Sequence, residues 1–331
     1  MALKLTVTCG PNPRLEPLID GTVKPDNIDL EFQVQPVEVL FYKNLHSDDF
    51  QVSEMSLSET LLARDRREKW GNGRWNWTAI PIFLSRGHAW VRAQVNRNSG
   101  IVSLSGLKGK RVAVPDYDMT AALWWRATLK DLYGIEASDI TWFNMRGRGL
   151  SHGIELGLNQ DPPPGVSLTW MPNMDDAAGM LNRGELDAGF SVYNPGVKPG
   201  PDVRNLLPDD GKQVIGEYFR KTRSFQPNHH YVIQDRIIKD EPWVVMELYH
   251  AFEKSKLVAY ERAQRSLSAY LYFEGNDFTE QAQTYGEDPY PFGLKAMRHT
   301  LQRLEQASFE QGLIRNHIAI ESLYHPSTLE T

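Results

Sequence analysis

Segments typical of β-strands and segments typical of α-helices alternate along almost the whole chain. Such alternation is characteristic of α/β proteins whose sheets are largely parallel. In the first part of the chain we predict strands at 5–9, 28–35, 49–55, 79–84 and 89–95, and helices at 14–19, 37–45 and 58–67.

The same order of elements begins again after a Leu-Lys-Gly-Lys turn at 107–110. Here we predict strands at 111–114, 140–143 and 186–192, and helices at 119–133 and 174–182, the first of them ended by Gly134. The repeat has the size of a whole lobe, which argues against a solenoid with repeats of roughly 20–50 residues.

Two further helices, at 241–265 and 292–311, form a tail that we expect to pack back on the first lobe. The chain has 331 residues, enough for two lobes. We therefore expect a first lobe at 1–95, a second lobe at 96–230, and a return to the first lobe with the C-terminal helices at 231–331.

The charge balance limits the kind of partner. Lys and Arg number 36 against 42 Asp and Glu, which gives a net charge of −6. A nucleic acid or an anionic membrane would favour a basic surface, so we expect neither as a partner. No apolar run approaches 18 residues, so we expect no transmembrane helix. The expected partner is a small molecule, with homo-oligomerisation left open.

Cys9 is the single cysteine, which excludes a disulfide framework and a zinc site built on cysteines. The first residues lack the positive region, apolar run and cleavage site of a secretory signal, so we expect a cytoplasmic protein.

Two α/β lobes commonly bind ligands between them, at the carboxyl ends of their strands. Arg14 begins a helix after a Gly-Pro-Asn-Pro turn and could bind an anion, or could be a surface arginine. Glu54 ends a buried strand and could be a general acid or base, or a solvated loop residue. Ser58 is expected to cap the following helix.

Two further segments carry histidine. Arg86 and His88 together offer a clamp for an anion and a group that transfers protons near neutral pH. His229 and His230 are neighbours in a predicted strand, so only one of them can face a cleft and they make a poor metal pair. The His152/Glu155 and His250/Glu253 pairs lack the HExxH pattern, and we expect no metal.

Several segments in order along the chain resemble the 4,5-dihydroxyphthalate decarboxylase family. The most specific are the Val-Ser-Glu-Met-Ser-Leu-Ser run at 52–58 and the Glu-Asp-Pro-Tyr-Pro run at 287–291. The others are Cys9-Gly10-Pro11 through Gly21, 107–115, 119–122, 184–188 and 310–313. The chain differs from the family pattern at 85–88, 193–195 and 226–228, where it carries fewer cationic groups.

The resemblance implies a type II periplasmic-binding-protein-like fold: two lobes, each a mixed sheet flanked by helices, with a cleft between them. It implies a carboxy-lyase that removes carbon dioxide from a hydroxylated aromatic acid without a cofactor, gives a protocatechuate-like product and serves the breakdown of aromatic compounds such as phthalate. It points to His88, His229 and Glu54 as catalytic residues. The expected substrate contacts are Arg14, Arg86, Ser53, Ser56, Ser58, Tyr117, Thr120, Tyr193, Asn194 and His230.

Two alternatives share this fold. A solute-binding protein would capture an aromatic or carboxylated ligand without catalysis, but it requires export. A thiamin-pyrimidine synthase would carry a cysteine-rich stretch, which a chain with Cys9 alone lacks.

Overall fold

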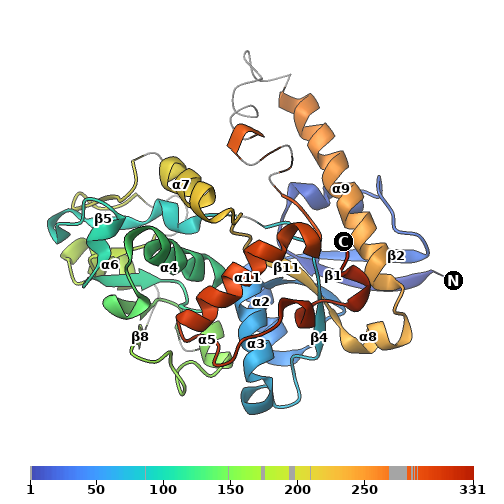
Figure 1. The fold of residues 1–331 in the computed structure, drawn as a ribbon, viewed down its shortest axis with the longest axis horizontal. Helices are drawn as coiled ribbons and strands as arrows, with labels where there is room; N and C mark the ends of the chain where they lie inside the picture. Colours follow the sequence, from blue (N-terminus) through green and yellow to red (C-terminus); the bar gives the residue numbers. More distant parts are fainter. Residues whose placement is uncertain are drawn as a thin grey trace.

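The computed structural model describes residues 2–85, 87–147, 149–172, 176–193, 198–208, 210–267, 282–284, 286, 288 and 290–331. Two sheets, each flanked by helices, lie side by side and form two lobes (Figure 1). In the described part of the chain, no helix is both long and apolar enough to cross a membrane.

The first sheet has five strands in the order β2-β1-β3-β11-β4. Their bounds are Leu3–Cys9 (β1), Ile28–Val34 (β2), Val52–Ser56 (β3), Trp77–Ile80 (β4) and His229–Gln234 (β11). β1 is parallel to β2 and β3, whereas β11 runs antiparallel to both β3 and β4. The helices of this lobe are α1 (Glu16–Ile19), α2 (Val37–Ser47), α3 (Leu57–Trp70), α8 (Asp235–Asp240) and α9 (Val244–Leu267).

The second sheet has six strands in the order β10-β5-β9-β6-β7-β8. Their bounds are Gln94–Asn96 (β5), Arg111–Val114 (β6), Thr141–Asn144 (β7), Ser167–Trp170 (β8), Ala188–Gly189 (β9) and Val203–Asn205 (β10). Its helices are α4 (Thr120–Tyr133), α5 (His152–Glu155), α6 (Asp176–Arg183) and α7 (Lys212–Thr222). α4 ends at Gly134, whose φ of 66° is a conformation that glycine adopts without a steric penalty.

The chain crosses from the first sheet to the second between β4 and β5 and returns between β10 and β11. These crossings lie near the lobe boundaries predicted at 95 and 230, and the exact boundaries stay predictions. In the tail, α9 packs on α1, whereas α11 (Leu294–Glu310) contacts both α3 and α4 (Figure 1). The largest apolar core includes residues of α3, α4 and α11, so one core continues through both lobes.

Some elements differ from the sequence predictions. The predicted strand at 89–95 is a 3-10 helix at Ala89–Arg92 followed by β5, and the predicted helix at 14–19 begins with a 3-10 turn at Pro13–Leu15. α3 begins earlier than predicted, with Ser56 rather than Ser58 as its cap; Ser56 Oγ accepts from the Glu59 amide at 3.5 Å. Two positions of the predicted helix at 174–182 lie outside the described residues, and α6 begins at Asp176.

Candidate functional site

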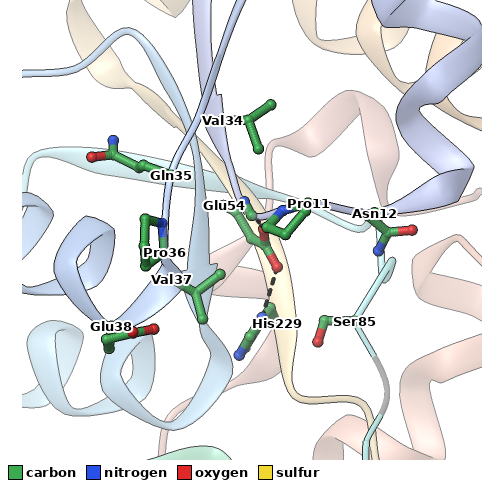
Figure 2. Close-up of a pocket in the computed structure, with 11 residues that line it drawn as sticks. Pro11, Asn12, Val34, Gln35, Pro36, Val37, Glu38, Glu54, Ser85 and His229 are labelled. Atoms are coloured by element: carbon green, nitrogen blue, oxygen red, sulfur yellow. Dashed lines mark hydrogen bonds and ion pairs between the residues drawn. The ribbon is translucent and has the colours of Figure 1, made fainter. Parts of the chain in front are cut away.

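A cavity of about 570 Å³ opens at the edge of the first sheet. Its volume is in the range usual for small-molecule sites. The lining comes from the loop after β1, the β2–α2 connection, β3, the loop after β4 and the start of β11 (Figure 2). The lining residues are Gly10, Pro11, Asn12, Val34, Gln35, Pro36, Val37, Glu38, Glu54, Ser85 and His229.

Glu54 and His229 form the central contact of this cavity. Glu54 Oε1 lies 2.7 Å from His229 Nδ1, and Glu54 Oε2 accepts a 2.8 Å hydrogen bond from the Gly10 amide (Figure 2 shows the pair). Strand pairing produces the contact, because β11 places Tyr231 opposite Glu54 and therefore His229, two residues away, on the same face.

The Glu54 carboxylate is ionised although only 4% of its residue surface is exposed. Burial raises the pKa of Glu54. The hydrogen bond from His229, the charge of that ring, the Gly10 amide and the Arg14 charge together outweigh burial, so the net pKa is below the ordinary value. An ionised carboxylate on Nδ1 holds that nitrogen as a donor and leaves Nε2 as the reactive ring atom.

Packing fixes the His229 ring and shapes the cavity wall. The Phe41 ring meets the His229 ring edge-on, with centroids 4.8 Å apart. A Cβ on Gly10 would come within 2.5 Å of Val37 Cγ1, so only glycine allows β1 and α2 to approach this closely. Gly10 and Phe41 were absent from the predicted site; Gly10 lies within a segment that resembles the family, whereas Phe41 carries no signal in the sequence.

A second cluster lies where the two lobes meet. Thr120 Oγ1 is 3.0 Å from Ser56 Oγ and accepts from the Ser58 amide at 3.0 Å. These contacts join the N-terminal ends of α3 and α4. The structure thus brings three predicted substrate contacts together, but in a group that is separate from the cavity lining.

His88 directly precedes the 3-10 helix at Ala89–Arg92, its carbonyl accepts from the Val91 amide at 2.9 Å, and its ring meets the Trp90 ring edge-on with centroids 6.0 Å apart. It does not line the cavity, whereas Ser85 does. Asn228 connects its loop to His229: the Asn228 amide donates to Ser85 O at 3.0 Å, and Asn228 Nδ2 donates to Gly87 O at 2.7 Å.

His230 points to the opposite face of β11 and contacts Thr60 Oγ1 at 2.9 Å and the Tyr324 hydroxyl at 3.2 Å. Burial lowers the pKa of His230 to about 3, so the ring is neutral. The prediction that only one of the paired histidines faces a cleft therefore agrees with the structure, and the one that does is His229. Ser53 is likewise internal, with its Oγ bonded to Thr8 and Asn44.

The remaining predicted contacts are dispersed. The Arg14 guanidinium donates to Leu84 O and lies over the Tyr290 ring. Tyr117 is buried in the second lobe, and Tyr193 accepts from Asn182 Nδ2 at 2.9 Å. Arg86 and Asn194 lie outside the described residues. Within the described ranges, no group of three His, Cys, Asp or Glu side chains is placed to hold a metal ion.

No protein-family model matches the sequence. The chain is 29% identical to a 4,5-dihydroxyphthalate decarboxylase of Comamonas testosteroni over 333 residues, covering 99% of this chain and 98% of that protein. It is 34% identical to one of Pseudomonas putida over 193 residues, covering 58% of this chain and 72% of that protein.

The chain belongs to the 4,5-dihydroxyphthalate decarboxylase family. The predicted enzyme class, a carboxy-lyase, is thereby confirmed. Among solved structures, this decarboxylase is similar to the periplasmic aliphatic sulphonate binding protein SsuA from Escherichia coli, with a TM-score of 0.56 and 14% identity over 100% of this chain and 95% of that one. It is also similar to the desulfurization enzyme DSZB, with a TM-score of 0.50 and 16% identity over 99% of this chain and 97% of that one. These similarities confirm the predicted two-lobed fold.

Proposed function

We propose that this decarboxylase removes carbon dioxide from a hydroxylated aromatic carboxylic acid at the cavity that contains Glu54 and His229. The observation that carries the proposal is the hydrogen-bonded series from the Gly10 amide through Glu54 to His229. A carboxylate that orients an imidazole in this way prepares the ring to transfer a proton.

In the proposed reaction, His229 Nε2 delivers a proton to the ring carbon that bears the leaving carboxylate. The bond between that carbon and the carboxylate then breaks, its electron pair restores the aromatic ring, and carbon dioxide departs. Each turnover replaces one carboxylate with one hydrogen and consumes one proton, which solvent returns to His229. The ring and its hydroxyl group carry the electrons during this exchange, so the scheme requires no redox cofactor.

The cavity has two unlike sides that suit such a substrate. Val34, Pro36 and Val37 provide an apolar wall for an aromatic ring. Asn12, Gln35 and Ser85 provide polar groups for its hydroxyls.

We assign further roles around this cavity. His88 is proposed to accept the phenolic proton and to return it to the product oxygen once the ring is aromatic again, since Asn228 holds its loop beside the start of β11. Arg14 and Arg86 are proposed to bind a carboxylate that stays on the ring. Ser56, Ser58 and Thr120 are proposed to contact substrate at the lobe junction. Ser53, Tyr117, Tyr193, Asn194 and His230 stay predictions from the sequence.

The test is incubation of the purified enzyme with a panel of dihydroxylated benzoates and phthalates, with detection of carbon dioxide and of the ultraviolet change of the product. His229→Ala should lower kcat by about 10²–10⁴-fold, the usual contribution of a positioned acid or base, and His88→Ala should also lower it. His250→Ala, on the exposed side of α9, is the control. Full turnover by His229→Ala would overturn the assignment, and tight binding without turnover across the panel would favour the solute-binding alternative.

We further propose that the protein is cytoplasmic, acts on a small molecule without a nucleic-acid or membrane partner, and can form homo-oligomers. The net charge of −6 supports the absence of a nucleic-acid or anionic-membrane partner, since either would favour a basic surface. Cell fractionation and size-exclusion chromatography test the location and the assembly.

A further inference from the structure

A buried histidine outside the cavity connects the second lobe to the cavity wall. His152 begins α5, between β7 and β8 of the second sheet, and only 1% of it is exposed. Its Nδ1 lies 3.0 Å from Glu59 Oε1 on α3, and its Nε2 lies 2.8 Å from the Glu38 carbonyl oxygen on α2. Both helices belong to the first lobe.

These two partners determine the protonation of the ring. A carbonyl oxygen only accepts hydrogen bonds, so Nε2 carries a hydrogen. Burial raises the pKa of Glu59, but the charge of His152 and its hydrogen bond outweigh burial and lower it, so Glu59 is ionised and also accepts. Both ring nitrogens therefore donate, which makes His152 an imidazolium. In agreement, burial lowers the pKa of His152 but Glu59 outweighs it and raises the pKa above the ordinary value.

The backbone of His152 is held firmly by the second lobe. Its amide donates to Asp116 Oδ2 at 2.9 Å, and Ser151 Oγ donates to Asp116 Oδ1 at 2.8 Å. Ser151 Oγ in turn accepts from Trp170 Nε1 at 3.0 Å. The imidazolium is thus attached to the framework of one lobe while its ring donates to the other.

The element that this ring holds is the wall of the cavity. Glu38, whose carbonyl accepts from His152, lines the cavity together with Val37 in the first turn of α2. Phe41, one turn further on, packs edge-on against both rings, with centroids 4.8 Å from His229 and 6.4 Å from His152. Movement of α2 away from His152 would therefore alter both the wall and the support of His229.

Other groups around the ring set its charge balance. Arg146 Nη1 lies 3.2 Å from His152 Nδ1 and 3.3 Å from Nε2, so it is nearly equidistant from the two nitrogens and not directed at one of them, and the in-line partners of the nitrogens stay Glu59 and the Glu38 carbonyl. The Arg146 charge opposes the imidazolium, whereas Asp116, 3.5 Å from Arg146 Nη1, favours it. Asp118 has its pKa raised well above the ordinary value by burial and by Asp116 and Glu59. Among the described residues, the titratable or charged groups that face His152 are Glu59 on α3, Tyr42 on α2, Asp116 and Asp118 after β6, and Arg146 after β7.

We propose that His152, as an imidazolium, is a positioning residue that ties the second lobe to α2 and Glu59 and so holds the cavity wall and His229 in place. The proposal rests on the proposed function in that it takes the cavity as the substrate site. The connection is present at neutral pH, where Glu59 is ionised, and is lost as the pH rises through the raised pKa of His152, because only the charged ring donates to both partners.

The test compares wild type with His152→Gln and His152→Ala, with His250→Gln as a matched control on the exposed side of α9. Hydrogen exchange of the amides at 38–42 is measured without substrate, and the dissociation constant of 3,4-dihydroxybenzoate is measured from pH 6 to 10. We expect the exchange rate of these amides and the dissociation constant each to increase about tenfold or more in the His152 variants. This is the effect of losing a hydrogen bond to a charged group. Amide exchange is expressed relative to that of an unstructured peptide at the same pH, because hydroxide catalysis raises intrinsic exchange with pH. In wild type this relative exchange rate should rise with pH, and the dissociation constant should approach that of His152→Gln. In His152→Gln the relative exchange rate should not change with pH.

Glutamine retains one donor without a charge, so His152→Gln remains informative if His152→Ala does not fold. An NMR titration of the His152 ring in wild type gives a further readout. Unchanged exchange at 38–42 in His152→Gln, or a ring that is neutral at pH 7, would overturn the proposal. Faster exchange at 38–42 in His152→Gln, together with no decarboxylation of the substrate panel by wild type, would support His152 as the residue that connects the lobes and would reject the proposed function.

Discussion

At the scale of single residues, the site depends on a carboxylate that stays charged although it is buried. Isolated in an apolar interior, Glu54 would bind a proton, because burial disfavours the charged form. Its two oxygens instead meet the Gly10 amide and His229. The contact with His229 that keeps Glu54 ionised also orients the His229 ring. A substitution that removes the Glu54 charge therefore also removes the orientation of that ring.

Glu54→Gln should lower kcat by about 10²–10⁴-fold, because the amide can present its nitrogen to His229 and favour the wrong tautomer. In wild type, the pKa of Glu54 is lowered, so the ionised pair is complete above the ordinary glutamate pKa and is lost as the pH falls through the lowered value. The acid limb of kcat/KM against pH should accordingly lie below the ordinary glutamate range. Glu16→Gln on the exposed side of α1 is the control, and equal kcat in the two variants would contradict the role of Glu54.

At the scale of elements, the starts of α3 and α4 share their hydrogen-bonding groups across the lobe junction. Ser56 caps α3 and also contacts Thr120, which in turn accepts from the Ser58 amide. Ser58 Oγ is buried and has no hydrogen-bond partner among the described residues. The Ser56 hydroxyl therefore makes hydrogen bonds that stabilise the start of α3, whereas the Ser58 hydroxyl makes none among the described residues.

Ser56→Ala should lower the free energy of unfolding by about 0.5–2 kcal/mol, the usual cost of removing a helix cap. Ser58→Ala should stay within about 0.5 kcal/mol of wild type, since its hydroxyl has no partner to lose. Urea denaturation of both variants measures the difference. A larger loss in Ser58→Ala than in Ser56→Ala would show that the cap lies at the position predicted from sequence rather than at Ser56.

At the scale of the whole molecule, the two lobes are joined by more than the two connections through which the chain crosses between them. The segment at 151–161 leaves the second sheet and lies against α3. Arg66, buried in α3, donates to Leu156 O at 3.2 Å and Asp161 O at 3.1 Å in this segment, and to Leu313 O at 3.2 Å in the C-terminal tail. One side chain thus connects both lobes and the tail.

Arg66→Lys should lower the free energy of unfolding by roughly 3 kcal/mol, because one ammonium cannot reach three carbonyls in two segments and each buried acceptor left unpaired costs roughly 1–3 kcal/mol. Arg64→Lys is the matched control: it too donates from α3 to a carbonyl, Ser322 O, but it is exposed, and the change should stay within about 0.5 kcal/mol. Chemical denaturation followed by fluorescence and circular dichroism gives both values. Equal midpoints for the two variants would refute a joining role for Arg66.

Much of the fold follows from local pattern. The strand at 111–114 and the helix ending before Gly134 are where periodicity and the glycine stop signal predict them. The segment at 89–95 is different, because its apolar residues alternate but do not form one strand. Trp90 packs in the core from a 3-10 helix, and only the end of the segment, in β5, pairs with β10 and β9. Alternation of apolar residues indicates which side chains are buried, and side chains are buried from a 3-10 helix as well as from a strand.

The sequence by itself determined the α/β class, the family resemblance and the fact that His229 and His230 must face opposite sides of a strand, because these depend on neighbouring residues. Only the tertiary structure decided which histidine reaches Glu54, 175 positions earlier, and that His152 meets Glu59, 93 positions away. The first pairing requires β11 to enter the first sheet antiparallel between β3 and β4, and the second requires the two lobes to meet. Contacts between distant segments depend on how sheets and lobes assemble, which no local period encodes.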